Sequence, residues 1–108
     1  MPASDAYPAG VSTGAMPAIQ MDVADHRLTA SHGNMGTAGR RYRETQKDLI
    51  RKGKLREAFM MDVLDIRAKF GDKYDAAIAE AAAYMECVNQ YKSKYGLPES
   101  GRRRRRRR

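Results

Sequence analysis

The strongest helical pattern in the chain lies in Leu55-Arg56-Glu57-Ala58-Phe59-Met60-Met61-Asp62-Val63-Leu64-Asp65-Ile66-Arg67-Ala68-Lys69-Phe70. Its large apolar residues step by four, four, three and four positions, through Leu55, Phe59, Val63, Ile66 and Phe70. Such spacing places all five side chains on one face of an α-helix. Met60, Leu64 and Ala68 widen the apolar surface. The sequence therefore predicts a central helix from about residue 54 to residue 69.

A second helix is predicted on the N-terminal side of this run, from about residue 38 to residue 52. Thr37 is its expected N-cap, since a threonine hydroxyl can accept a hydrogen bond from the first exposed N–H groups. Gly53 follows as the expected left-handed stop. The apolar positions of this helix form only a narrow stripe, made of Ala38, Tyr42, Leu49 and Ile50.

A third helix is predicted on the C-terminal side, from Asp72, its expected cap, to about residue 94. Gly71 ends the central helix, while Gly96 and Pro98 end the third. The buried face of the third helix is expected to comprise Tyr74, Ala77, Ile78, Ala81, Met85 and Val88. Because the connections at Gly53 and Gly71 are short, neighbouring helices should run antiparallel.

The chain is therefore predicted to be mainly α, with a three-helix body at about residues 37–95. Its 108 residues allow one domain and not two. Residues 1–24 are predicted to form an extended or disordered arm, and residues 25–96 a single helical domain that begins with a polar junction. Residues 97–108 are predicted to be a disordered basic tail. The residues expected to be buried are Phe59, Val63, Ile66, Ile78 and Met85.

The arm carries a weaker pattern of its own. Ile19, Met21 and Val23 alternate with polar or small residues, which is the period of an extended chain. A single strand cannot pair with itself, so the pattern favours an extended segment laid on the helical body. Prolines and glycines upstream of it favour loop structure.

The composition argues against an internal disulfide and against a membrane-spanning helix. The single cysteine, Cys87, excludes an internal disulfide, and its place in a helical run predicts a buried, inert thiol. No apolar run approaches the roughly 20 residues that a membrane-spanning helix needs, so no membrane span is predicted.

The net charge of +8 is concentrated at the C-terminal end of the chain. Arg102 to Arg108 supply seven of the 21 basic residues, which leaves 14 basic against 13 acidic residues and a net charge of +1. Residues 40–56 still carry a net +6 and residues 62–86 a net −3, so the body is expected to be dipolar. Three interpretations of the arginine run stay open: a nucleic-acid-binding tail, an address or membrane-surface anchor, and an appended tag.

The polar junction holds the two histidines of the chain, His26 and His32. His26 is a candidate general base, and His32 with Asn34 are candidate ligands of a divalent metal. The alternative is that these side chains only make loop hydrogen bonds, since Ser, Asn and Gly are typical of turns. The histidine spacing matches no structural zinc site, and no phosphate-binding loop is present.

Basic residues crowd the first of the predicted helices. Arg40, Arg41, Arg43 and Lys47 are candidate nucleic-acid-binding residues, because guanidinium and ammonium groups neutralise phosphates. The alternative interpretation is a charged helix face that is simply solvated.

Three segments of the chain carry a family resemblance. They are Asp25-His26-Arg27-Leu28-Thr29-Ala30-Ser31-His32-Gly33-Asn34, then Tyr42-Arg43-Glu44 with Leu49-Ile50, then Met61-Asp62-Val63-Leu64-Asp65-Ile66-Arg67-Ala68-Lys69-Phe70-Gly71-Asp72-Lys73-Tyr74-Asp75-Ala76-Ala77-Ile78. Over about residues 17–92 the chain resembles the C-terminal toxin regions of bacterial polymorphic toxins, the Rhs-type and type VI secretion effectors. Many such tips are nucleases of the HNH or His-Me kind.

The resemblance implies a role for His26 as base or metal ligand, a divalent metal as cofactor, and a nucleic acid and a cognate immunity protein as partners. The chain departs from a full HNH pattern, because it has no histidine before His26 and none after His32. A complete metal site would therefore need a further ligand.

Two functions of different classes follow. The first is the tip domain of a polymorphic toxin or secreted effector, a metal-dependent nuclease delivered to a target cell. The second is a non-enzymatic helical interaction module, a cytoplasmic protein that binds protein or nucleic acid. In a nuclease, His26, His32 and Asn34 should converge and face solvent beside the basic helix.

Overall fold

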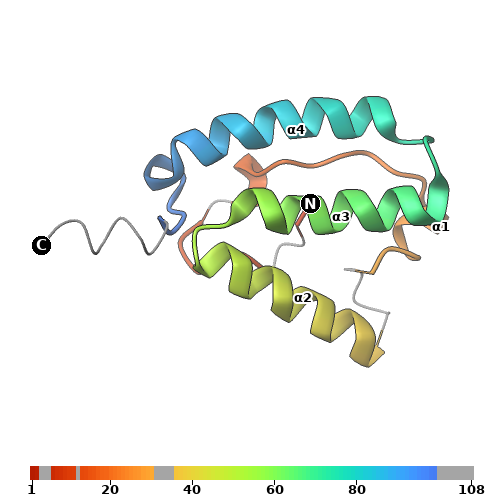
Figure 1. The fold of residues 1–108 in the computed structure, drawn as a ribbon, viewed down its shortest axis with the longest axis horizontal. Helices are drawn as coiled ribbons and strands as arrows, with labels where there is room; N and C mark the ends of the chain where they lie inside the picture. Colours follow the sequence, from red (N-terminus) through yellow and green to blue (C-terminus); the bar gives the residue numbers. More distant parts are fainter. Residues whose placement is uncertain (3–5, 12, 31–35, 100–108) are drawn as a thin grey trace, which may run out of the picture.

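The computed structural model describes residues 1–2, 6–11, 13–30 and 36–99, and these form a mainly helical fold without strands (Figure 1). The main helices are α2 (Gly36–Arg51), α3 (Leu55–Phe70) and α4 (Asp75–Gln90). Shorter helical turns are η2 (Thr13–Ala15), α1 (Val23–His26) and η4 (Lys92–Tyr95). The prediction of a mainly α chain with a three-helix body is therefore confirmed. Among these residues, no helix combines the length and the hydropathy of a membrane span.

The breaks between the main helices fall at the predicted glycines. Gly53 and Gly71 have φ angles of 80° and 63°, in the left-handed region that glycine adopts at little cost. The predicted caps are wrong. Thr37 is not the N-cap of α2, because the helix already begins at Gly36. Asp72 lies in the turn before α4, and Tyr74 occupies the cap position there.

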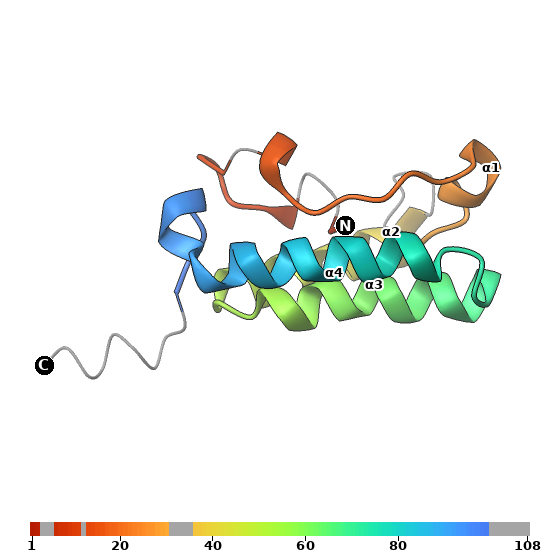
Figure 2. The ribbon, with the colours of Figure 1, turned by 90° about the horizontal axis from the view of Figure 1, so that it is seen from above.

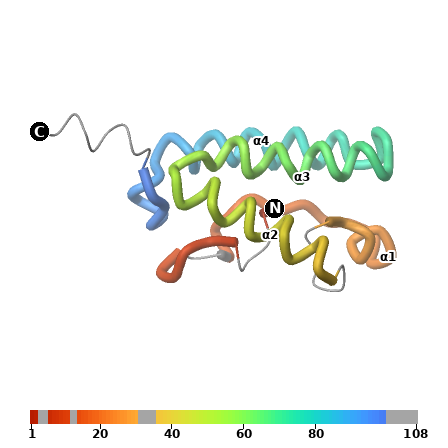
Figure 3. The backbone as a smooth tube through the Cα atoms, turned by 60° about the horizontal axis from the view of Figure 1, so that its bottom comes forward, coloured from red at the N-terminus to blue at the C-terminus, as the bar shows by residue number. Residues whose placement is uncertain are grey.

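α3 is the central helix, since it packs against both α2 and α4. Figure 3 shows α3 and α4 side by side in one layer, with α2 and the N-terminal segment on one side of that layer. Phe59, in the middle of α3, has no exposed surface. The predicted core is confirmed, because all five of its members are buried: Phe59, Val63, Ile66, Ile78 and Met85.

The N-terminal segment folds onto this layer and adds to its core. Residues 17–22 run extended beside the helices (Figure 2), and the main-chain N–H of Asp22 donates to the Tyr74 hydroxyl at 3.1 Å. Leu97, at the other end of the described chain, is buried as well. The core thus extends past both ends of residues 25–96. The buried side chains of the N-terminal segment include Ala6, Tyr7 and Met16.

Three side chains of the body that the sequence predicts to be covered are exposed to solvent. Met60 and Leu64 of α3 are 42% and 65% exposed, because no described element covers this side of the helix (Figures 2 and 3). Cys87, expected to be a buried thiol, is exposed. The buried face of α4 passes through Met85 and Val88, and Cys87 projects from another side of the helix.

Candidate nucleic-acid interface

Four basic side chains of α2 lie on one flank of that helix. Arg40, Arg43, Lys47 and Arg51 are spaced by three, four and four positions, so they follow one another along the same side of an α-helix. At a rise of 1.5 Å per residue, the row is about 16 Å long. We call these four residues the basic stripe. The side of α2 that faces the core carries Gly39, Gln46 and Ile50 instead.

Arg41, also a predicted nucleic-acid-binding residue, does not belong to the stripe, because it lies on another flank of α2. Consecutive residues of an α-helix are about 100° apart, so Arg41 projects from a different flank than Arg40. Arg51, one turn beyond Lys47, is the fourth member of the row, where the prediction had Arg41. Three of the four predicted residues thus share one flank, and their binding of nucleic acid stays a prediction.

α2 carries five basic and two acidic residues, so the helix keeps a net positive charge. Asp48 pairs with Lys52 at 2.9 Å and with Arg51 at 3.3 Å. These two cationic side chains are 61% and 59% exposed, and ion pairs so open to solvent contribute at most about 1 kcal/mol. A phosphate that arrives at Arg51 therefore competes only with a weak internal pair.

Two polar side chains on the inner side of α2 fix the rotation of the helix, and the sequence interpretation missed both contacts. The Tyr42 hydroxyl donates to Oδ1 of Asp62 at 2.8 Å, and Nε2 of Gln46 donates to the carbonyl of Ala58 at 2.9 Å. Asp62 and Ala58 belong to α3, so both bonds tie α2 to the central helix and set the flank on which the basic stripe lies. Arg40 and Arg51 of the stripe are exposed, and Arg43 and Lys47 are half-buried. One signal was present in the sequence. Asp62 lies three positions after Phe59 on the buried face of α3, where an acid is rare.

Asp62 is a buried carboxylate with few hydrogen-bond donors. It is 5% exposed, and burial raises its pKa. Burial also raises the pKa of the Tyr42 hydroxyl, and the nearby charge of Asp62 raises it further. Among the described residues, Oδ2 of Asp62 and Oε1 of Gln46 have no hydrogen-bond partner. Because a buried acceptor without a donor costs about 1–3 kcal/mol, a negative charge is unfavourable at this position.

The segment that holds His26 is fastened to the turn between α3 and α4. Nζ of Lys73 donates to Oδ2 of Asp25 at 2.6 Å and to Oδ2 of Asp22 at 2.7 Å. The Tyr74 hydroxyl also donates to Oδ2 of Asp25, at 2.6 Å. The hydrogen bonds from Lys73 and Tyr74 hold the pKa of Asp25 below its usual range. Asp25 therefore holds α1 in place, while His26, the last residue of α1, is exposed.

Two residues of α3 anchor the chain that follows α1. Nζ of Lys69 donates to the carbonyl of Leu28 at 2.7 Å. Oδ2 of Asp65 accepts a hydrogen bond from the main-chain N–H of Ala30 at 2.7 Å. These contacts, with those of Asp25, set residues 22–30 against the end of the layer where α3 meets α4.

The candidate metal ligands His32 and Asn34 lie outside the described residues. Within residues 1–2, 6–11, 13–30 and 36–99, no three His, Cys, Asp or Glu side chains gather as metal ligands would. His26 is thus placed at the surface, and a metal site built with His32 and Asn34 stays a prediction.

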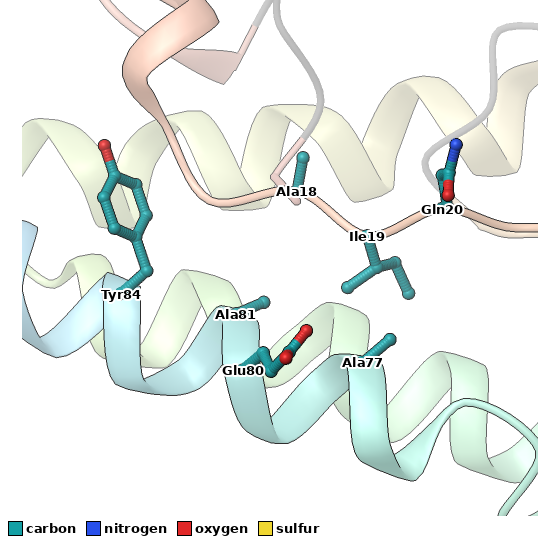
Figure 4. A pocket seen from close by; sticks show the side chains of 7 residues that line it. All are labelled: Ala18, Ile19, Gln20, Ala77, Glu80, Ala81 and Tyr84. Atoms are coloured by element: carbon teal, nitrogen blue, oxygen red, sulfur yellow. The ribbon is translucent and has the colours of Figure 1, made fainter.

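A pocket of about 340 Å³ lies between the extended N-terminal segment and α4 (Figure 4). Figure 4 shows Ile19 pointing toward α4, and the Tyr84 hydroxyl donates to the carbonyl of Ala15 and so braces the segment. Glu80 is the one charged side chain of the lining, so the pocket offers no set of catalytic or metal-binding groups. Its lining consists of Ala18, Ile19, Gln20, Ala77, Glu80, Ala81 and Tyr84.

Comparison with known proteins finds no match to this chain among family models, curated proteins or solved structures. Function is therefore inferred from the residues and their geometry alone.

Proposed function

We propose that this chain binds the phosphate backbone of a nucleic acid through the basic stripe of α2. The observation that supports the proposal is the row of four cations along about 16 Å of one helix flank. Side chains that neutralise phosphates release condensed counterions, which makes such binding favourable and dependent on salt. The hydrogen bonds of Tyr42 and Gln46 to α3 hold this row in a fixed orientation.

The stripe is suited to the backbone rather than to the bases. Arginine and lysine neutralise phosphates without reading sequence. Sequence-tolerant binding of single strands usually adds aromatic side chains on which bases stack. The one aromatic residue of α2, Tyr42, is bonded inward to Asp62. We therefore expect little preference among base sequences.

Seven arginines, Arg102 to Arg108, follow the described residues in the sequence and are a second source of phosphate affinity. A chain that ends at Gly101 separates the two sources, because it keeps the whole of α2 and removes the arginine run. The contribution of the tail is the difference in affinity between this chain and the full chain.

Exchanging three stripe residues, in Arg40→Gln, Arg43→Gln and Lys47→Gln, should weaken binding and flatten its salt dependence. Each lost phosphate contact reduces the slope of log K against log salt by about 0.7–0.9. The triple variant, made in the chain that ends at Gly101, should therefore lose roughly 2–3 units of slope. Fluorescence anisotropy with a labelled DNA duplex and a labelled single-stranded RNA, at several salt concentrations, measures this change.

The matched control carries Arg41→Gln, Lys52→Gln and Lys94→Gln, which remove the same net charge away from the stripe. It should keep nearly the whole slope. Equal losses in the two triple variants would show that net charge alone drives binding. Binding that disappears with the arginine run would assign the affinity to the tail. Either result would refute the proposal that the basic stripe binds the nucleic acid.

A second candidate function, the metal-dependent nuclease tip of a polymorphic toxin, has one observation in its favour. His26 is exposed on α1, and α1 lies at the same end of the molecule as the start of α2, where the stripe begins (Figure 1). In this role His26 would act as general base on water while the stripe holds the phosphodiester. His32 and Asn34 would hold a divalent metal, which supplies charge stabilisation at the leaving oxygen. The chain would then be a secreted effector with a cognate immunity protein as partner.

For this second candidate, His26→Ala should reduce cutting of DNA or RNA by about 10²–10⁴-fold, the usual contribution of a general base. Circular dichroism should show unchanged helical content, since the side chain is exposed. A gel assay of plasmid and RNA cleavage with magnesium, manganese or zinc measures the loss, and Arg27→Ala on the neighbouring exposed position is the control. Wild-type protein that cuts neither substrate with any of these metals would exclude the nuclease and leave the binding module.

A further inference from the structure

The side of α3 that faces away from α2 and the N-terminal segment carries a regular row of side chains. Arg56, Met60, Leu64 and Arg67 are spaced by four, four and three positions, so they lie along one side of the helix. Two large apolar residues thus stand between two arginines. Leu64, at 65%, is among the most exposed large apolar side chains of the described residues.

α4 presents a matching row beside it, with the opposite character. Asp75, Ala79, Ala82 and Glu86 are spaced by four, three and four positions, so two small residues stand between two acids. The two helices are joined at both ends of these rows. Arg56 donates to Glu86 through Nε at 2.7 Å and through a terminal nitrogen at 2.6 Å, and Nε of Arg67 lies 3.3 Å from Oδ1 of Asp75.

We call these two rows together the outer face. No described element covers it, since α2 and the N-terminal segment lie on the other side of the α3–α4 layer (Figures 2 and 3). The outer face is asymmetric in two respects. Its α3 row is bulky and ends in two arginines, with the acid Glu57 beside Arg56, and its α4 row is small and ends in two acids.

When a second copy is rotated by 180° and laid on the outer face, the large residues of one copy meet the small residues of the other, and the arginines of one copy meet the acids of the other. A two-fold axis that runs parallel to the helices, midway between two facing layers, would place α3 of each copy over α4 of the other. Met60 and Leu64 would then pack over the alanines of the second copy, where small side chains leave room for them. At the ends, Arg56 would face Glu86 of the second copy and Arg67 would face Asp75 of the second copy.

We infer that the outer face binds a second copy of this chain, as an isologous dimer in which the two α3–α4 layers form a four-helix arrangement. The apolar centre supplies the affinity, because exposed ion pairs alone contribute little. The charged ends set the orientation, because a rotation that placed α3 over α3 would bring like charges together. The partner is a second copy because both the size pattern and the charge pattern of the face match their own rotated image.

The first test is the oligomeric state in solution. Sedimentation velocity of the full chain over a wide range of concentrations should show a monomer–dimer equilibrium. Leu64→Lys should raise the dimer dissociation constant by at least about tenfold, since it places a charge in the apolar centre. Val23→Lys is the matched control, because Val23 is 68% exposed and lies on α1, away from the outer face. A wild type that is monomeric at every concentration, or a dimer that Leu64→Lys leaves intact, would overturn the inference.

The second test asks which helices face each other. Arg56→Glu and Glu86→Arg should each weaken the dimer, because each places like charges opposite one another across the axis. An equimolar mixture of the two variants should restore a dimer, since each of the two contacts across the axis would then join a glutamate to an arginine. Both positions are about half exposed, so circular dichroism should show a wild-type helical content in each variant. A mixture that dimerises no better than the separate variants would refute the proposed arrangement.

Discussion

Phe59→Ala is expected to lower the free energy of unfolding by about 3–5 kcal/mol. Phe59 has no exposed surface and lies in the middle of α3, the helix that packs against both α2 and α4. Removing its ring deletes buried apolar surface and leaves a cavity that the surrounding helices fill only in part. Since domains of this size are stable by about 5–15 kcal/mol, the variant should be close to unfolding at moderate temperature.

Urea denaturation followed by circular dichroism measures this loss. Tyr91→Ala is the matched control, because it also truncates an aromatic side chain but at a position that is 53% exposed. It should cost less than about 1 kcal/mol. If Phe59→Ala cost no more than the control, the three main helices would not share a core around this residue.

Asp62→Asn is expected to raise the free energy of unfolding at pH 7, by about 1–3 kcal/mol. The charged Asp62 is buried and its Oδ2 has no donor among the described residues. Asparagine keeps an acceptor for the Tyr42 hydroxyl and replaces the unpaired oxygen with an N–H donor. The substitution therefore removes a buried charge without removing the contact that ties α2 to α3.

The burial of Asp62 also makes the stability of the protein depend on pH. Burial raises the pKa of Asp62 above its ordinary value of 3.8. In the wild type this group contributes stability that is fully present below that ordinary value. The contribution is lost as the pH rises through the pKa of the folded state. Asp62→Asn should abolish this loss, which denaturation curves at a series of pH values would show.

Asp65→Asn is the control for Asp62→Asn, because it changes a carboxylate one turn further along the same helix. Asp65 accepts hydrogen bonds or ion pairs from the main-chain N–H of Ala30 and from Nζ of Lys69, both at 2.7 Å. Neutralising it should lower stability. A fall in stability for Asp62→Asn at pH 7 would instead mean that the buried charge is well compensated, for example by the nearby amino group of Met1.

Helical spacing predicts which side chains share a face, and it therefore located α3 and its buried side. The glycines at positions 53 and 71 located the breaks, because glycine is the usual helix stop. Helical spacing does not say whether a second element covers a given face. For this reason the sequence places Met60 and Leu64 on an apolar surface and Cys87 in the interior, although all three are exposed.

The basic stripe follows from the same spacing, and only the exchange of Arg41 for Arg51 separates the predicted set from the observed row. The contact between Tyr42 and Asp62 joins residues 20 positions apart. It depends on how α2 and α3 are rotated against each other, which a pattern within either helix does not contain. The position of His26 at the surface likewise depends on distant partners of α1, Lys73 and Tyr74.

The packing of the N-terminal segment has a consequence for the synthesis of this chain on the ribosome. The segment is synthesised before the three main helices, but it meets residues that follow them: a Cβ added at Gly96 would lie 3.3 Å from the carbonyl oxygen of Gly10. At 5–20 residues per second, roughly 4–17 s separate the synthesis of these two positions. During that interval Tyr7 and its buried neighbours have no completed core to enter, so the nascent chain exposes an apolar segment to chaperones and proteases until residue 97 has emerged.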